Sequence, residues 1–372
     1  MGLAIGLELV VFKFLFGFHI NNDTDSYISI SRFFRGEEPL IFPNRYLNPF
    51  YPFISATIFL WLSPTNSLIL TNIIFYFGVV LLTYGLLRRV FNPTVGFASA
   101  LLIMTAYPMI RYGLTQVQDL GGYFWFVATL YAGWRWFKEK KFGWLLLSSL
   151  SVSLGLLTKE SGAMGAVFVG ILILLEQNAF LAKVKYILLF SILPFITLVI
   201  NNWRGQKINY SSGEWFIWNW GAYAPTNYTF LRWLGVNVTT YNLLWIAVAI
   251  GLVFLIKNWR TTSYDIKIYL LAVILPSFSY LAWPVFIGRT VFISAWLFVP
   301  VAMYGLQQLY ERNRLGKYAA LVIFCLALIS PTLLQYTLRY AHVFAIYEKC
   351  DRSISCSWGE FWRTRDSIST KL

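Results

Sequence analysis

The sequence predicts an all-α polytopic membrane protein. Hydrophobic residues make up 58% of its 372 residues and charged residues only 12%, and the mean hydropathy is +0.60. Soluble globular chains carry about 25% charged residues, so this chain is far more apolar. Apolar runs of about 20 residues, the length that crosses a bilayer, recur from end to end. We therefore expect one membrane domain of about eleven transmembrane helices, with external juxtamembrane helices, rather than a soluble domain on an anchor.

The predicted spans follow the apolar runs in order along the chain. They cover residues 2–19, 68–87, 93–110, 118–137, 142–158, 161–176, 186–202, 241–257, 266–287, 290–309 and 318–338. No small-residue cleavage site is identified after the first run, which favours a retained helix. Segment 47–63 is apolar but short, with Pro49 and Pro52 near its start. It either crosses the bilayer or dips into it and returns.

Positive charge distinguishes these two alternatives. Lys and Arg gather in five short loops between the runs, at residues 88–89, 138–141, 183–185, 257–260 and 312–317. Short cytoplasmic loops are enriched in these residues. If segment 47–63 does not cross, all five loops lie inside together with the N-terminus.

In that topology the loops 20–66 and 203–240 lie outside, residues 1–338 form the transmembrane domain, and residues 339–372 form an external tail. The tail is basic, but long segments carry less weight in this rule. The net charge of +14 is then explained by topology, and no nucleic-acid partner is expected.

Two aspartates, Asp23 and Asp25, follow the first apolar run in the stretch HINNDTDSYISISRFFRG. Carboxylates this close to a bilayer stay in water, so they mark a wet surface at one membrane face. An Asp-x-Asp pair there can hold a divalent cation, deprotonate an acceptor or bind a sugar hydroxyl. The structural alternative is that the pair caps a short interfacial helix.

Further charged residues are predicted on the same external side. Asp119 begins a helix, where an acid also suits the helix dipole, and the glycines that follow it would let a substrate approach the backbone. Lys159 and Glu160 lie between two spans and either reach towards water or bind a phosphate and a substrate hydroxyl. Arg289 is either a headgroup anchor or a bidentate phosphate ligand.

The external loop 203–240 carries five tryptophans and one acid, Glu214. Tryptophans of this kind form an aromatic belt at the membrane interface or flat surfaces for sugar rings. Cys350 and Cys356 in the tail form a small disulfide or remain a free pair.

The sequence has no Walker-type phosphate loop and no dinucleotide fingerprint. With His19 and His342 as its only histidines, it offers little material for a histidine metal site or a catalytic triad.

Several of these motifs, in their order and spacing, resemble GT-C glycosyltransferases. The resemblance is to the branch with protein O-mannosyltransferases and lipid A aminoarabinose transferases, and it covers residues 20–165 and 285–306. It is carried by Asp23, Tyr27 and Arg32, by NRYLNPFYPFI with Arg45, by GLLRRVF, by Asp119, by LLTKESG and by GRTVFISAWLFVPVAMYGL.

The resemblance implies an enzyme of the cytoplasmic (inner) membrane. It would transfer a sugar from a polyprenyl-phosphate carrier to a lipid, glycan or protein acceptor on the outer face, by inverting displacement. Asp23 falls at the catalytic base, although Thr24 separates it from Asp25 where those relatives have Asp-Glu, so either acid is a candidate. Asp119 falls at the acid of the second external loop.

The expected substrate-binding residues are Tyr27, Arg32, Arg45, Lys159, Glu160, Glu214 and Arg289. The expected partners are the polyprenyl-phosphate-linked sugar donor, the acceptor and membrane lipids. The sequence identifies no definite cofactor, and a divalent cation held by Asp23, Asp25 and Asp119 remains an open alternative.

Two other function classes fit the composition. A transporter or lipid flippase would also place charges in a wet cavity, although no internal repeat relates two halves of this chain. The other class is a non-catalytic assembly subunit that keeps the remains of an active site.

Overall fold

The computed structural model describes residues 22–109, 116–208, 230–283 and 288–330, together with residues 213, 214, 217, 220 and 221. All regular elements in this part of the chain are helical, which confirms the all-α prediction. The predicted span 2–19, the end of the last span, the tail and both tail cysteines lie outside the described residues.

The helices follow one another with short connections. They are α2 (Asn22–Phe34), α3 (Pro43–Tyr46), α4 (Phe50–Ile58), α5 (Pro64–Val90), α6 (Pro93–Thr105), α8 (Asp119–Glu139), α9 (Phe142–Thr158), α10 (Glu160–Ala163), α11 (Gly165–Leu175), α12 (Phe180–Lys207), α14 (Phe230–Tyr241), α15 (Leu244–Lys257), α16 (Tyr264–Ser277), η1 (Ser279–Ala282), α17 (Gly288–Val291), η2 (Phe292–Ser294) and α18 (Ala295–Arg312), and a further helix covers 314–330.

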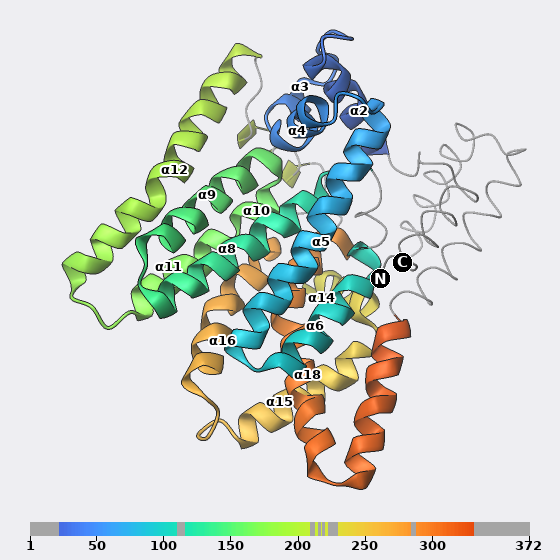
Figure 1. Cartoon of the computed structure of the whole chain (residues 1–372), viewed down its shortest axis with the longest axis vertical. Coiled ribbons are helices and arrows are strands. Elements are labelled where there is room, and N and C mark those ends of the chain that lie inside the picture. The colour runs from blue at the N-terminus through green and yellow to red at the C-terminus, as the bar shows by residue number, and fades with distance from the viewer. Residues whose placement is uncertain are drawn as a thin grey trace, which may run out of the picture.

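Helix α8 lies at the centre of the bundle. It packs against α5, α9, α10 and α11, and the short helices α2, α3 and α4 gather at one end of the molecule (Figure 1). Most of the α8 side chains are buried, including those of Phe126, Trp134 and Trp136. Burying large aromatic side chains is strongly favourable, so α8 forms a rigid support for residues at its ends.

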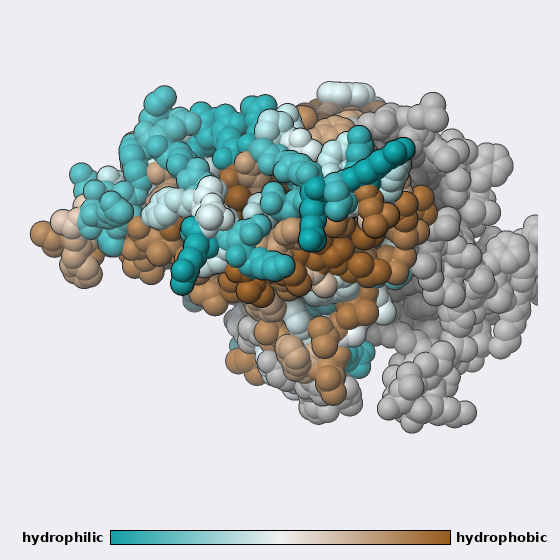
Figure 2. Space-filling view, turned by 90° about the horizontal axis from the view of Figure 1, so that it is seen from below, coloured by the Kyte–Doolittle hydropathy of each residue, from teal (hydrophilic) through white to brown (hydrophobic). Residues whose placement is uncertain are grey.

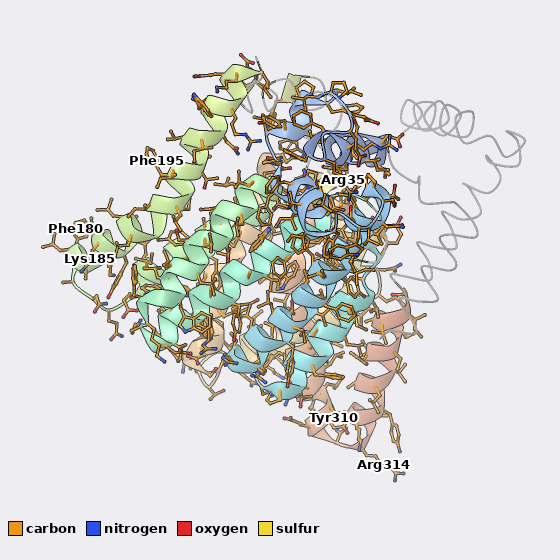
Figure 3. All side chains as sticks on the ribbon, turned by 45° about the horizontal axis from the view of Figure 1, so that its top comes forward. Arg35, Phe180, Lys185, Phe195, Tyr310 and Arg314 are labelled. Atoms are coloured by element: carbon orange, nitrogen blue, oxygen red, sulfur yellow. The ribbon has the colours of Figure 1, made fainter. Side chains whose placement is uncertain are left out.

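Helix α12 has the opposite character, because only 11% of its apolar window is buried. Phe180 and Phe195 are 77% and 67% exposed, and both lie on the outer side of this helix (Figure 3). An apolar helix with so little protein contact is suited to a lipid environment.

Four helical segments among the described residues are long and apolar enough to cross a membrane: α5, α12, Tyr264–Leu281 and Gly288–Arg312. Helices α14 and α15 pass this test only as a pair, and the pair is bent by 104°. Three further predicted spans correspond to shorter apolar helices, Pro93–Thr105, Phe142–Thr158 and Glu160–Leu175. The architecture is that of a polytopic membrane protein, and the count of eleven spans stays a prediction.

The bend between α14 and α15 has a local cause. Asn242, between the two helices, has a left-handed φ of 47°, a conformation that Asn tolerates better than most residues. The predicted span 241–257 therefore begins at Leu244, and α14 runs in another direction before it.

The ambiguous segment 47–63 contains α4, which has nine residues. At 1.5 Å per residue such a helix is about 14 Å long, against about 30 Å of bilayer hydrocarbon. Arg35 fixes the end of this segment against α2, because its guanidinium donates to the carbonyl of Leu62 at 2.6 Å and to the hydroxyl of Ser67 at 3.0 Å. This geometry favours a segment that does not cross.

Polar residues also gather at the end of the bundle away from α2, α3 and α4. Arg314 lies there, opposite Arg35 (Figure 3), and the view from below shows hydrophilic side chains beside hydrophobic ones on this face (Figure 2). The two ends of the molecule therefore each carry charge, with the apolar helices between them.

Candidate active site

The candidate site is organised around the guanidinium of Arg289, in the short helix α17. Its Nη1 atom lies 3.2 Å from Oδ2 of Asp23 and 3.3 Å from Oδ2 of Asp119. The backbone of Arg289 is held as well, because the hydroxyl of Tyr123 donates to its carbonyl at 2.6 Å. One cation thus joins α2, α17 and the first residue of α8, which lie far apart in the sequence.

Arg45 holds the other side of Asp23. Its Nη2 atom donates to Oδ1 of Asp23, its Nε donates to the hydroxyl of Ser26 at 3.0 Å, and its Nη1 donates to the hydroxyl of Tyr27 at 3.0 Å. The guanidinium also lies 4.6 Å from the centre of the Tyr27 ring. Four contacts of one side chain fix the short helix α3 against α2.

Lys159 completes the cluster through Asp119. Its Nζ lies 2.8 Å from Oδ1 of Asp119, whose side chain is 2% exposed. Lys159 is in an extended conformation between α9 and α10, so the chain turns there and presents the ammonium group to the start of α8. The α8 dipole adds to the stabilisation of the Asp119 carboxylate.

The glycines after Asp119 serve helix packing. A Cβ atom on Gly121 would lie 2.7 Å from a methyl carbon of Thr158, and one on Gly122 would lie 2.1 Å from the hydroxyl of Ser161. We expected these glycines to admit a substrate. The structure gives them a different role, because they let the junction of α9 and α10 approach α8 and so bring Lys159 within reach of Asp119.

The cluster carries an excess of positive charge. Three cations, Arg45, Lys159 and Arg289, face two carboxylates, and the side chains of the three cations are 21%, 14% and 22% exposed. Burial alone would raise the pKa of Asp23, but the charges of Arg45, Arg289 and Lys159 hold this pKa below its usual 3.8. Asp23 is therefore ionised at neutral pH.

This arrangement does not fit a bound divalent cation. No group of three or more His, Cys, Asp or Glu side chains among the described residues could hold one. The oxygens of Asp23 and Asp119 already contact cations. Asp25 is exposed, and residues two apart on a helix do not face each other. A site with more cations than carboxylates is suited to an anion instead.

The structure brings together five of the residues expected from the sequence, Asp23, Asp119, Lys159, Arg289 and Arg45, with Tyr27 beside them. Other expected residues are not part of this ion-pair cluster. Arg32 pairs with Glu38 at 2.6 Å on the surface, and Glu214 is exposed. Glu160 follows Lys159 directly and is half-buried at the start of α10.

Sequence reasoning missed several residues that support the site. Ser26 and Tyr123 hold Arg45 and Arg289, as described above. Arg204, near the end of α12, donates to the carbonyl of Tyr46 and lies 4.3 Å from the centre of its ring. Arg204 thereby fixes the residue next to Arg45. The sequence offered one indication of this role, because Arg204 lies just after the end of a predicted span. Basic residues at that position commonly only anchor a helix at the membrane surface.

The comparisons with known proteins agree with this fold. A family model described as dolichyl-phosphate-mannose-protein mannosyltransferase matches residues 48–202. No curated protein gives a significant match.

Similar structures include the oligosaccharyltransferase of Archaeoglobus fulgidus. Its apo form aligns with a TM-score of 0.54 and 13% identity, over 93% of this chain and 58% of the archaeal one. Its complex with Zn and sulfate aligns with a TM-score of 0.53 and 15% identity, over 88% and 51% of the two chains. The chain thus spans a little over half the length of that enzyme. The chain thus has a fold similar to that of this oligosaccharyltransferase, and its residues 48–202 are similar to the mannosyltransferase family.

Proposed function

We propose that the protein transfers a sugar from a polyprenyl-phosphate carrier to an acceptor hydroxyl at the outer face of the cytoplasmic membrane. The observation that carries this proposal is the cluster in which Arg289 contacts both Asp23 and Asp119 while Arg45 and Lys159 flank them. A carboxylate next to an excess of cations offers a base for the acceptor and a binding site for a phosphate.

The charge balance of the reaction suits this cluster. The acceptor oxygen forms a bond to the anomeric carbon and loses its proton to a carboxylate. The bond between that carbon and the phosphate oxygen breaks, and the carrier phosphate leaves with one more negative charge than it had in the donor. Cations placed at this oxygen stabilise the charge as it develops. Direct displacement in this way inverts the anomeric centre.

Asp23 is the better candidate for the base. Its side chain is 26% exposed, against 2% for that of Asp119, so an acceptor reaches Asp23 more easily. A low pKa makes a carboxylate a weak base. A donor phosphate that draws Arg289 towards itself would remove one of the charges that lower the pKa of Asp23, and donor binding would then prepare the base.

We assign no step to a metal ion. The archaeal oligosaccharyltransferase has been solved with Zn and sulfate, whereas the described residues of this chain include no group of three or more His, Cys, Asp or Glu side chains that could hold a metal ion. Sulfate, like phosphate, is a tetrahedral anion, and the three cations of the cluster are suited to such a group.

Replacement of the base tests the proposal. The Asp23→Asn variant keeps the shape of the side chain but does not accept the proton, so turnover should fall by about a hundredfold to ten-thousandfold. Donor binding should survive, since the carboxylate does not hold the phosphate. Transfer is measured with radiolabelled polyprenyl-phosphate sugars and membranes that contain the full-length protein.

The exposed neighbour provides the matched control. The Asp25→Asn variant should be much milder, because Asp25 lies outside the cluster. If Asp25→Asn abolishes transfer and Asp23→Asn does not, the two roles are exchanged. If neither change affects transfer, or if the wild-type protein moves the lipid across the bilayer without transferring sugar, the proposed catalysis is wrong.

A further inference from the structure

A second group of polar side chains lies beside the ion-pair cluster without taking part in it. Tyr280, in η1, is 4% exposed, and Ser161, in α10, is 1% exposed. Neither hydroxyl makes a hydrogen bond of normal geometry within the described part of the chain, although the two hydroxyls lie close enough to interact with each other. Buried hydroxyl groups are normally satisfied, so each exception calls for an explanation.

The two hydroxyls lie close to each other and to the cluster. The side chain of Ser161 neighbours that of Tyr280, which also lies in the electrostatic field of Glu160, Asp119 and Arg289. Helix packing fixes Ser161, because its hydroxyl occupies the space that a Cβ on Gly122 would take. Gly122 lies only one turn after Asp119 in α8.

Glu160 adds a third polar group of different character. It is half-buried, and its side chain makes no hydrogen bond or ion pair within the described ranges. A carboxylate only accepts hydrogen bonds, whereas a hydroxyl both donates and accepts. Together with Tyr280 and Ser161 it can satisfy a ligand that carries several hydroxyl groups.

We propose that Tyr280, Ser161 and Glu160 form a subsite for the hydroxyl groups of the transferred sugar. This inference rests on the proposed function and assigns residues to the sugar of the donor. The sugar is bonded directly to the phosphate, so its hydroxyls must lie within a few bonds of the cations that bind the phosphate. A second phosphate is a poor occupant because Glu160 would repel it, and an acyl chain would leave the polar groups unpaired.

The test compares donor lipids with and without a sugar. The full-length protein in lipid nanodiscs is titrated with polyprenyl-phosphate mannose, polyprenyl-phosphate glucose and polyprenyl phosphate. The wild type should bind at least one of the sugar-bearing lipids more tightly than the bare lipid phosphate. Tyr280→Phe and Ser161→Ala should each weaken binding of that lipid by about two- to tenfold, the usual effect of losing one neutral hydrogen bond. Binding of polyprenyl phosphate should stay unchanged.

A buried tyrosine with a partner inside the protein serves as the control. The hydroxyl of Tyr269 donates to the carbonyl of Trp296 at 2.6 Å, so Tyr269→Phe should lower the melting temperature without changing the preference between lipids. Tyr280→Phe should lower the melting temperature less than Tyr269→Phe does, because the Tyr280 hydroxyl makes no hydrogen bond of normal geometry to the described part of the protein. This comparison separates a role in ligand binding from one in folding.

The remaining outcomes are distinguishable. If the wild type binds bare and sugar-bearing lipids equally, or if Tyr280→Phe and Ser161→Ala weaken both kinds equally, the sugar subsite is wrong while binding of the carrier phosphate stands. If the wild type binds none of these lipids, the proposed function fails and the subsite fails with it.

Discussion

Arg289 is the residue on which the site depends most, because a single guanidinium contacts both carboxylates, Asp23 and Asp119. Removal of one partner of a buried ion pair leaves the other charge uncompensated. Here a donor phosphate would supply the replacement charge for Arg289, while the cations Arg45 and Lys159 would continue to hold the carboxylates. Arg289 is thus the cation that can exchange a carboxylate for a donor phosphate at the lowest cost in free energy.

The first residue-scale prediction concerns this phosphate contact. Lys159→Ala and Arg289→Ala should chiefly weaken apparent affinity for the lipid donor, by about tenfold to a hundredfold each, because charge-assisted contacts contribute about 1.5–3 kcal/mol. The effect is measured as the dependence of the transfer rate on the concentration of the lipid donor. Lys138→Ala is the matched control, since Lys138 lies at the other end of α8 and pairs with Asp265 at 2.8 Å. Unchanged donor dependence in both well-folded test variants would return Lys159 and Arg289 to a purely structural role.

The pKa of Asp23 leads to a second prediction, about stability. Because the cations hold this pKa below 3.8 in the folded protein, the unfolded chain binds the proton more tightly. The stabilisation from Asp23 is therefore fully present above the unfolded-state pKa, decreases as the pH falls below it, and is lost below the folded-state pKa. Thermal unfolding between about pH 6 and about pH 3 should show a steeper loss of stability for the wild type than for Asp23→Asn. If the melting temperatures of the two proteins fall in parallel with pH, the cations do not lower the pKa of Asp23.

The sequence predicted the charged residues of the candidate site better than the residues that hold them in place. Asp23, Asp119, Lys159 and Arg289 are conspicuous because charge is rare in an apolar chain and follows the ends of spans. Tyr280 carries no such signal, since an isolated tyrosine near a span end is typical of the membrane interface. Only the fold shows that its hydroxyl is buried.

At the scale of the elements, the packing of α8 against α9 and α10 determines where Lys159 lies. Two adjacent glycines and the extended residue Lys159 allow the two chain segments to approach closely. The position of the Lys159 ammonium group is therefore a consequence of helix packing. A substitution that alters this packing without changing any charge should disturb the site.

Gly122→Ala tests this dependence. Its Cβ would lie 2.1 Å from the hydroxyl of Ser161 and 3.2 Å from Cβ of Lys159, so the Ser161 side chain must shift and Lys159 must move away from α8 by a few tenths of an ångström. Overpacking of this kind costs about 1–3 kcal/mol, and we expect a lower melting temperature together with weaker donor binding. Gly170→Ala is the control, because a Cβ there meets nothing within 4 Å and should stabilise α11 by up to about 1 kcal/mol. If donor affinity stays normal in Gly122→Ala, the position of the Lys159 ammonium group does not depend on this helix packing.

Element boundaries were predictable where charged residues mark them. The span predicted at 142–158 coincides with α9, since Lys141 and Lys159 bound its apolar run on either side. The span predicted at 266–287 instead ends as an α-helix at Ser277 and continues as η1. Pro276 lies in its last turn, and apolar composition alone does not reveal such a change of helix type.

At the scale of the whole molecule, the site itself constrains the topology. Asp23 and Asp119 contact the same guanidinium, so both lie at one membrane face. If α5 and α6 each cross the bilayer, the segment with α4 must return to the side from which it came. The basic turn that contains Arg314 lies at the opposite end of the bundle (Figure 3), as the positive-inside rule requires for an external site.

Thiol labelling tests this orientation at three exposed positions. Single cysteines are placed at Glu37, Trp61 and Lys141 in a background from which the 3 native cysteines have been removed. Glu37 lies before α4 and is exposed, Trp61 lies after α4 and is 74% exposed, and Lys141 is in a basic turn with its side chain 74% exposed. An impermeant reagent should label positions 37 and 61 in intact cells, and position 141 only after the membrane is opened. If positions 37 and 61 differ, α4 belongs to a segment that crosses. If they agree but only position 141 reacts in intact cells, the site faces the cytoplasm, and the donor would have to be presented on the inner leaflet.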